Sequence, residues 1–353
     1  MINCLWPWDS PLRAWRLLAV GSVVVAAACS APAAAVEESP EVTVATAGAT
    51  LHDPVWSYRN NALVGISDDG RIAEITDLES PGHAMTRLSP PIAPGRNLQI
   101  SRKDPQHIFV PQPQRNKVAV LDLETLRQVD EFDAGPAPAY LAEDAGMRVL
   151  LALSADGKSV TPVDEYGFRK LSTANLGGDS ADTIDGANRG RDIEYHTYGP
   201  AGIRYYRGSA SPPQELGSLP MNVGPSAGDG AAVTRSYVAP HNDDTLYVID
   251  LRRAGKGLKY RAATRLPSPI RQIGTDDTRI YAATDQEVAT LETNSFMRFE
   301  DDKIPVLRIT KYRSALPESQ RSAPLAGMAI GPHRVYLTFK GTPLVVSVAK
   351  PHL

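Results

Sequence analysis

The residue types that carry enzyme chemistry occur in this chain, but the local spacings that assemble them do not. The sequence contains no H-E-x-x-H metal motif, no C-x-x-C-H haem attachment and no Walker A loop. Its seven histidines include no pair at i, i+2 or i, i+4, so no short segment presents a ready metal site. Any functional site must therefore be assembled from residues that the fold brings together.

The N-terminal residues have the pattern of an export signal. Two arginines precede the apolar run 17–28, which at about twelve residues is short for a membrane span and typical of a secretory h-region. The run leads into Cys29 through "VVVAAACSAPAA", and this arrangement resembles a bacterial lipoprotein signal. The resemblance implies cleavage before Cys29, lipidation of that cysteine and a flexible tether at 29–40. An ordinary A-x-A cleavage site in the same alanine stretch is the alternative.

Composition narrows the class of protein. The net charge of −3, with both signs scattered, gives no electrostatic footprint for nucleic acid, so no nucleic-acid partner is expected. Gly 27 and Pro 29 against 7% aromatic residues indicate many turns and favour an all-β chain. The other cysteine, Cys4, lies in the export signal, so the exported domain is expected to have no thiol available for a disulfide or a Cys-ligated metal.

Pairs of short strands joined by tight turns recur along the chain. Each first strand is apolar or alternating, and each turn carries residues that tolerate positive φ, such as Asp-Gly or Lys-Gly. The pairs recur about every 41–45 residues, with one longer interval of about 55 before the last. The predicted hairpins span 62–78, 107–123, 148–164, 192–207, 236–251, 279–293 and 334–350.

A short segment precedes each hairpin, and a more polar run follows most of them. Four strands in a period of about 43 residues are typical of a β-propeller blade, which packs on its neighbours to bury both faces. We therefore expect an all-β fold, a seven-bladed β-propeller of four-stranded antiparallel blades. The innermost strands are expected at 53–58, 96–101, 138–144, 182–186, 228–233, 270–276 and 325–331.

The two ends of the repeat region are expected to close the ring. The last hairpin leaves the seventh blade without an outermost strand, and the strand-like run 41–48 has no hairpin partner. Pairing 41–48 with the last blade supplies that strand and covers an open sheet edge. The predicted organisation is an export signal at 1–28, a tether at 29–40 and a single propeller domain at 41–353.

One stretch also resembles a known repeat. Residues 116–164, "NKVAVLDLETLRQVDEFDAGPAPAYLAEDAGMRVLLALSADGKSVTPVD", are similar to the YVTN-type propeller repeat, N-x-V-x-V-I-D followed by T and then V-G-x-x-P. "DTLYVID" at 244–250 fits the same pattern, whereas 143–146 lacks the proline of the repeat's P-D-G turn. The resemblance implies the fold and no particular activity, because propellers host binding modules and enzymes alike.

The propeller topology predicts where polar side chains converge. The innermost strand of each blade lines a central channel, so residues at the starts of these strands meet at one of its mouths. Arg271 stands out because a charge beside an apolar strand start needs a partner. Mixed charge there suits a small polar ligand or a partner's loop, although a solvated, mutually paired ring is the alternative. The expected ligand-binding residues are His52, Asp53, Arg96, Asn97, Tyr140, Asp182, Asp229, Arg271 and Gln272.

Histidines on neighbouring blades form a second candidate site. Antiparallel blades place His83, His107 and His333 on one rim, in blades 1, 2 and 7, where imidazoles from adjacent blades could bind zinc or copper. Scattered surface histidines are the simpler interpretation. No cofactor is predicted, and a divalent metal remains open.

These observations favour a binding or accessory protein over an enzyme. We expect a propeller that is lipid-anchored at the outer face of the cell membrane and presents a rim to a protein or a small polar ligand. One alternative is a propeller enzyme of the lactonase or quinone-type dehydrogenase kind. Such an enzyme needs a channel metal or a quinone, and Trp56, the one tryptophan after the export signal, is expected in the core. The other alternative is an exported zinc chaperone.

Overall fold

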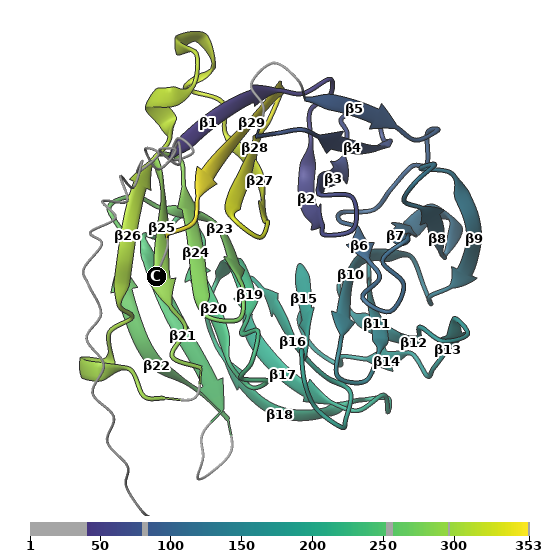
Figure 1. The fold of residues 1–353 in the computed structure, drawn as a ribbon. Coiled ribbons are helices and arrows are strands. Elements are labelled where there is room, and N and C mark those ends of the chain that lie inside the picture. Colours follow the sequence, from purple (N-terminus) through teal and green to yellow (C-terminus); the bar gives the residue numbers. More distant parts are fainter. Residues whose placement is uncertain (1–40, 80–83, 252–256, 296, 352–353) are drawn as a thin grey trace, which may run out of the picture. The chain divides into compact units, whose positions relative to one another are not determined.

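The computed structural model describes four ranges of the chain, 41–79, 84–251, 257–295 and 297–351. The expected export signal, the tether with Cys29, and the metal candidate His83 lie outside the described residues. Within those ranges, seven antiparallel sheets are arranged around a central axis as the blades of a propeller (Figure 1). This arrangement confirms the predicted all-β fold class and the predicted seven blades of four strands.

Each blade begins at the centre of the ring and ends at its margin. In blade 3 the outermost position is shared by two short strands, because both β13 and β14 pair with β12. The strands of blades 1 to 3 are β2 (His52–Ser57), β3 (Ala62–Ile66), β4 (Ile72–Thr76), β5 (Met85–Leu88), β6 (Gln99–Ile100), β7 (His107–Gln112), β8 (Lys117–Asp122), β9 (Gln128–Asp133), β10 (Pro138–Asp144), β11 (Val149–Ser154), β12 (Ser159–Asp164), β13 (Arg169–Lys170) and β14 (Ala174–Asn175).

The remaining blades repeat this plan. The strands of blades 4 to 6 are β15 (Thr183–Gly186), β16 (Glu194–Gly199), β17 (Gly202–Arg207), β18 (Gln214–Leu219), β19 (Val223–Gly228), β20 (Ser236–Pro240), β21 (Thr245–Leu251), β22 (Leu258–Arg265), β23 (Ile270–Thr275), β24 (Arg279–Thr284), β25 (Glu287–Glu292) and β26 (Val306–Lys311). Blade 7 consists of β27 (Leu325–Ile330), β28 (Arg334–Phe339), β29 (Thr342–Ala349) and β1 (Val42–Thr46).

Burial explains why the hairpins are so apolar. The second and third strands of a blade are covered on both faces by the neighbouring blades, so β3 and β11 are buried at every residue. The fourth strands alternate or face solvent, as in β5 and β9. The apolar clusters accordingly lie between adjacent blades, for example between blades 5 and 6 and between blades 6 and 7. Each blade therefore depends on its neighbours for a core.

The predicted ring closure is present. Strand β1 pairs antiparallel with β29, with Val42 opposite Val348 and Thr46 opposite Leu344. Ala45 is buried in the cluster between blades 7 and 1. On the other side, the Glu41 carboxylate accepts a hydrogen bond from Thr310 Oγ1 (2.9 Å) on β26. The N-terminal strand thus joins blade 7 to both of its neighbours.

The innermost strand of blade 5 differs from the prediction. It was expected at 228–233, but β19 runs from Val223 to Gly228. Residues 229–235 form the turn into β20, in which the Asp229 carboxylate accepts hydrogen bonds from the backbone of Ala231 (2.8 Å) and Ala232 (2.7 Å). A register shift between Val223 and Ser226 accommodates Pro225 inside a strand, which the sequence pattern does not reveal.

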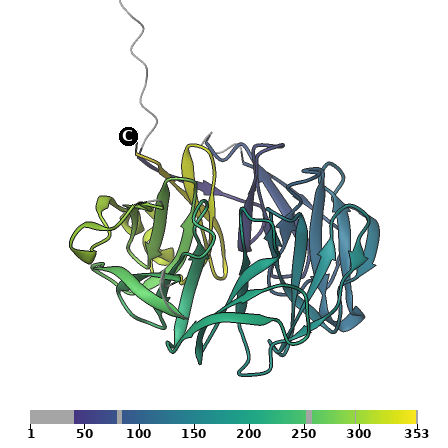
Figure 2. The same ribbon diagram turned by 90° about the horizontal axis from the view of Figure 1, so that it is seen from below.

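The helices of the described ranges are single turns of 3-10 type. They are η1 (Pro113–Arg115), η2 (Glu300–Asp302), η3 (Arg313–Ala315) and η4 (Glu318–Gln320). None of the helices in the described part of the chain has the length and apolar character required to span a bilayer. Turned by 90°, the ring shows its blades edge-on, with loops gathered on two opposite rims (Figure 2).

Candidate functional site

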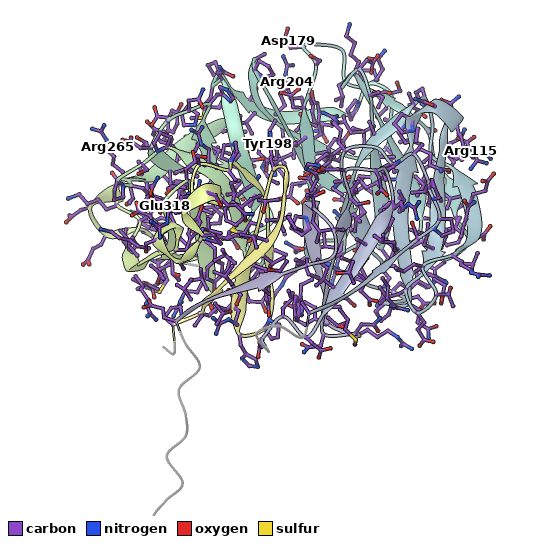
Figure 3. The ribbon with its side chains drawn as sticks, turned by 90° about the horizontal axis from the view of Figure 1, so that it is seen from above. Arg115, Asp179, Tyr198, Arg204, Arg265 and Glu318 are labelled. Atoms are coloured by element: carbon purple, nitrogen blue, oxygen red, sulfur yellow. The ribbon has the colours of Figure 1, made fainter. Side chains whose placement is uncertain are left out.

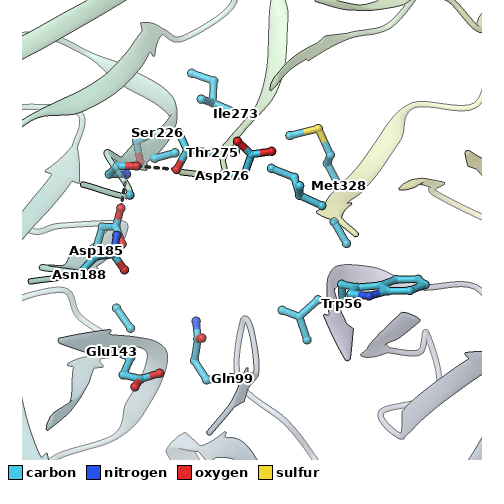
Figure 4. Close-up of a pocket in the computed structure, with 18 of the residues that line it drawn as sticks. Trp56, Gln99, Glu143, Asp185, Asn188, Ser226, Ile273, Thr275, Asp276 and Met328 are labelled. Carbon is cyan, nitrogen blue, oxygen red and sulfur yellow. Dashed lines mark hydrogen bonds between the residues drawn. The ribbon is translucent and has the colours of Figure 1, made fainter. Parts of the chain in front are cut away.

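The seven innermost strands surround a central channel with a cavity of about 1060 Å³. We call the rim where these strands begin the upstream rim and the rim where they end the downstream rim. The lining residues run from the middle of the innermost strands to the turns that follow them, so the cavity lies toward the downstream rim. A close-up shows side chains from all around the ring facing one open space (Figure 4).

Two buried carboxyl groups form a pair beside the channel. Glu143 of β10 is 9% exposed and lines the cavity, and Glu165, in the turn after β12, is 4% exposed. Burial, and to a lesser extent the neighbouring Glu165 carboxylate, raises the pKa of Glu143 to about 8. Burial also raises the pKa of Glu165, although Ser101 Oγ donates a hydrogen bond to its Oε2 (3.1 Å). Near neutral pH the pair therefore retains a proton.

Asp185 of β15 is the second acidic group of the channel wall. The backbone N–H of Gly228 donates to Asp185 Oδ2, and any side chain at position 228 would collide with that carboxylate. Burial raises the pKa of Asp185 to about 6, against the opposing effects of the Gly228 N–H and Arg102. The Gly228 carbonyl in turn accepts a hydrogen bond from Thr275 Oγ1 (2.7 Å), so one chain of hydrogen bonds links three innermost strands (Figure 4).

Arg102 supplies the positive charge between these carboxyl groups. Its Nε lies 3.6 Å from Glu143 Oε2, and its Nη1 donates to Asn188 Oδ1 (2.9 Å). Asn188 Nδ2 donates onward to the Asp229 carbonyl (3.2 Å). The side chain of Arg102 is largely exposed, because it follows the short strand β6 on the downstream rim. This wall can accept hydrogen bonds from a ligand, and the protonated Glu143–Glu165 pair keeps one acidic proton beside it.

The opposite wall is apolar. Trp56 of β2 stacks on Tyr336 with ring centroids 4.6 Å apart, which confirms the expected core position of this tryptophan. Met328 and Ile330 of β27 line the same side of the cavity. The channel therefore has a charged wall on blades 3 and 4 and an apolar wall on blades 7 and 1 (Figure 4).

Of the nine residues expected at the upstream mouth, Tyr140 lines the channel cavity and the other eight do not. The Arg96 guanidinium lies over the Tyr140 ring, 5.8 Å from its centroid. Asn97 is buried and bonds both the N–H and the carbonyl of Leu141, so it joins blade 2 to blade 3. These contacts are structural, since they join the start of β6 in one blade to β10 in the next.

The other predicted mouth residues are dispersed around the upstream rim. His52 pairs with Asp68 in the next turn of the same blade. Asp53 is exposed, and the surrounding rim raises its pKa to about 6 by partial burial, while His52, Arg96 and Lys340 oppose that shift. Asp182 is exposed and Gln272 is half-buried.

The predicted placement of Asp229 is wrong, because it follows the end of β19. It lies on the downstream side, where its buried carboxylate also accepts hydrogen bonds from Tyr237 Oη and from Ser295 Oγ (2.9 Å).

Arg271 belongs to a second, separate cavity. This cavity of about 470 Å³ lies on the upstream rim between blades 6 and 7. Arg271 Nε donates to Asp285 Oδ2 (2.8 Å), so the expected partner of this charge comes from the turn between β24 and β25. The cavity is also lined by Arg313, Arg321 and Lys340. We call these five residues the basic pocket.

The histidine candidates stay apart where they are described. His107 Nδ1 lies 3.5 Å from Asp104 Oδ2, and His333 is exposed in the turn between β27 and β28. His83 lies outside the described residues. In the ranges that the structure describes, no group of three or more His, Cys, Asp or Glu side chains is arranged to hold a metal ion.

The main polar residues of the channel were not predicted. The predicted set consists of strand starts, whereas Glu143, Asp185 and Arg102 lie at or beyond strand ends. The sequence signal that could have identified such a channel residue is an acidic residue inside a segment that is expected to form an innermost strand. Residues 224–228, "GPSAG", also have the G-x-S-x-G spelling of a nucleophile motif, which the predictions omit. Ser226 lies within strand β19, however, 3.5 Å from Thr183 Oγ1, and not at a strand–turn–helix elbow.

Comparison with known proteins supports the fold and assigns no family. No protein-family model matches the chain, and no curated protein matches it. A chain of the crystal structure of the mitotic checkpoint complex aligns with a TM-score of 0.66 at 10% identity, covering 94% of this chain and 100% of that chain. Virginiamycin B lyase from Staphylococcus aureus aligns with a TM-score of 0.62 at 9% identity, covering 88% and 99%. U3-55K aligns with a TM-score of 0.63 at 11% identity, covering 88% and 98%.

These neighbours share the fold and differ in what their names say they do. One is a lyase, and another belongs to a checkpoint complex. The molecule is thus a seven-bladed β-propeller whose channel has one charged and one apolar wall, and this fold is used by binding modules and enzymes alike.

Proposed function

We propose that this protein is an exported, lipid-anchored propeller of the YVTN-repeat type that binds a small polar ligand, or the loop of a partner protein, in its central channel. The observation that carries the proposal is the two-sided channel, with Glu143 and Asp185 opposite Trp56 and Met328. Pockets of a few hundred to about 1,000 Å³ with an apolar wall and a few convergent polar groups are typical of small-molecule sites. The ligand enters from the downstream rim.

The chemistry of the walls defines the ligand class. Asp185 and the Glu143–Glu165 pair hold protons more tightly than free carboxyl groups because they are buried. A cationic or donor-rich group can take the place of those protons, and its approach favours the ionised carboxylates. The apolar part of the same ligand packs against Trp56 and Met328. A ligand with an ammonium or guanidinium group and a short hydrocarbon part fits both walls.

Trp56 provides a direct test of the channel. It is the one tryptophan after residue 28, so fluorescence of the exported chain reports on the channel wall. We expect spermidine, choline or arginine to change this fluorescence saturably, and Asp185→Asn to weaken the effect about tenfold through loss of a charged acceptor. Asp192→Asn is the matched control, since Asp192 is an exposed carboxyl on the same rim and does not line the channel cavity. An unchanged titration in Asp185→Asn would refute the channel site.

The membrane anchor is proposed from the residues that precede the propeller. Cys29 follows a short apolar run and small residues, and a tether of about twelve residues separates it from β1. Strand β1 begins on the downstream rim, since Glu41 lies beside Ala349 and Lys350 beside His333. An anchor there would attach on the rim toward which the channel cavity lies. Cys29→Ala should move the protein from the membrane fraction to the soluble fraction, whereas continued membrane association contradicts the anchor.

One observation favours an enzyme as the second candidate. Glu143 has a pKa of about 8 and lies beside Arg102, so it holds a proton at neutral pH as a general acid must. A lactonase-like or other acid–base activity would then be lost in Glu143→Gln while ligand binding to Trp56 persisted. Loss of binding together with activity, or no turnover of any bound compound, supports the binding module instead.

A further inference from the structure

The basic pocket is independent of the channel in position and in charge. It lies on the upstream rim, where the turns of blades 6 and 7 meet the long connection 312–324 between them. Four of its lining side chains are cationic and one, Asp285, is anionic. An excess of positive charge inside a cavity of about 470 Å³ attracts an anion unless other groups neutralise it.

Arg313 is fixed at the back of this pocket. It is 7% exposed, and its guanidinium packs over the rings of Phe339 and Tyr312, 5.3 and 5.7 Å from their centroids. Its Nη1 donates to the Ala323 carbonyl (2.7 Å), and its Nη2 lies 3.4 Å from Asp285 Oδ1. The position of this charge is therefore set by the protein and not by solvent.

Arg271 is oriented in the same way but keeps a free donor. Its Nε and Nη1 donate to Asp285 Oδ2 (2.8 Å) and Asn242 Oδ1 (2.6 Å). Among the described residues, no acceptor is bonded to its Nη2, and Lys340 Nζ likewise has no hydrogen-bond or ion-pair partner there. Two donors at the pocket are thus available to a ligand.

The hydrogen bonds that hold the 312–324 connection explain only part of this cluster of cationic side chains. Arg321 donates to the carbonyls of Leu316 (2.9 Å) and Ser314 (3.1 Å), and Arg313 to that of Ala323, so both hold the 312–324 connection. Carbonyl groups accept hydrogen bonds but carry no net charge, so the cationic excess remains. The nearby Asp53, whose pKa Lys340 lowers, offsets it in part from the neighbouring blade.

We propose that the basic pocket binds a small molecule through a phosphate or carboxylate group. Guanidinium groups match both oxyanions in geometry and stay charged at every physiological pH, and the exposed Lys340 adds a third point of attraction. The volume suits a compact metabolite and not an extended chain. The oxyanion is bound by Arg271 Nη2 and Lys340 Nζ at the mouth, with Arg313 behind it. This site does not depend on the proposed channel ligand.

Calorimetric titration of the full chain at constant ionic strength tests the proposal. Inorganic phosphate and citrate are the two probes, and the tighter one identifies the oxyanion. We expect one saturable site, with affinity reduced about tenfold in Lys340→Gln and in Arg271→Gln. Arg265→Gln is the control, since that side chain is 79% exposed on the outer margin of blade 5 (Figure 3).

Three outcomes overturn the proposal: no saturable binding of either probe, wild-type affinity in both Lys340→Gln and Arg271→Gln, or a loss of affinity in Arg265→Gln as large as theirs. Lys340 is exposed, so Lys340→Gln should fold normally, and its melting temperature checks this. Asp185→Asn separates the two sites, because it should weaken the channel ligand and leave phosphate binding unchanged.

Discussion

The channel and the basic pocket hold buried charge in two different ways. The channel wall uses carboxyl groups, and burial raises the pKa of Glu143 to about 8 and that of Asp185 to about 6. These groups can discharge by taking up protons when no ligand is bound. The basic pocket uses arginines, which stay charged at any physiological pH. Its charge can be balanced only by fixed carboxylates or by an anion.

The two sites also differ in the elements that position them. The channel is built from the regular innermost strands, so its side chains are placed by the register of the whole ring. The basic pocket depends on turns and on the connection 312–324, which two of its own arginines hold in place. Blade 7 contributes to both, with Met328 in the channel and Leu325 at the pocket. This difference predicts which substitutions damage one site and which damage both.

A substitution that opens the ring should weaken binding at both the channel and the basic pocket. Ala45 is 4% exposed on β1, which closes blade 7, and Ala45→Asp buries an unpaired carboxylate there. We expect a loss of about 3 kcal/mol or more in the free energy of unfolding, measured by urea denaturation, and weaker binding at both sites. The adjacent Thr46 is exposed, so Thr46→Asp should change stability by about 0.5 kcal/mol or less. Equal effects of the two substitutions would show that closure through β1 is unimportant.

Removing the central arginine of the basic pocket should damage one site only. Arg313→Leu leaves the carbonyls of Ala323 and Asp285 without their buried donor, while the Asp285 carboxylate keeps its ion pair with Arg271. We expect a loss of about 2–3 kcal/mol in the free energy of unfolding, because two carbonyl groups lose a buried charged donor, and a loss of phosphate binding. The Trp56 fluorescence titration should be unchanged. A variant that binds phosphate normally would mean that Arg313 serves only the connection 312–324.

The Glu143–Glu165 pair should make the free energy of unfolding depend on pH. The native pKa of Glu143, about 8, exceeds its unfolded value near 4.5, so the native state binds more protons between these values and stability falls as pH rises. Glu143→Gln keeps a neutral donor toward Glu165 and removes this penalty. We expect the variant to gain on the order of 2 kcal/mol over wild type at pH 8–9 and little at pH 5.

Glu131→Gln is the matched control for that profile. Gln128 and then Arg115 hold the pKa of the partly exposed Glu131 below its usual range, so any contribution to stability is lost only on the acid side. Denaturation curves collected from pH 5 to 9 compare the two variants with wild type. If the stabilities of wild type and Glu143→Gln changed in parallel with pH, that result would contradict a proton held on the buried pair.

Much of the fold was predictable because its signals are local. Each hairpin combines β-branched strands with a turn that favours positive φ, such as Asn116 or Gly157, and both requirements are met within about sixteen residues. Ring closure followed from a missing strand at one end and a spare strand at the other. The innermost strand of blade 5 was misplaced because "VGPSAG" has turn residues. Its extended conformation depends on packing, with Gly228 against the Asp185 carboxylate of blade 4.

The channel site was less predictable for a related reason. Which end of an innermost strand faces the cavity depends on how seven blades tilt together, and no single segment encodes that. Tyr140 was therefore the one mouth residue of the predicted set to line the cavity, while Glu143, three residues later, was missed. Arg271 was singled out on a local argument about charge. Its partner Asp285 comes from the same blade, but Arg313 and Lys340 come from segments that only the ring brings together.

The smallest expected effect comes from a carboxyl group on the upstream rim that lines neither cavity. Partial burial raises the pKa of Asp53 to about 6, while the charges of His52, Arg96 and Lys340 oppose that rise. Asp53→Asn removes a negative charge near Lys340 and should strengthen phosphate binding at pH 7.5 about two- to threefold, a modest gain because solvent screens the pair. Asn tolerates the positive φ of 41° at this position, so folding should be preserved. Calorimetry at low and high salt measures the change, which should shrink at high salt. An affinity that falls instead would mean that Asp53 orients Lys340 toward the anion and does not compete for it.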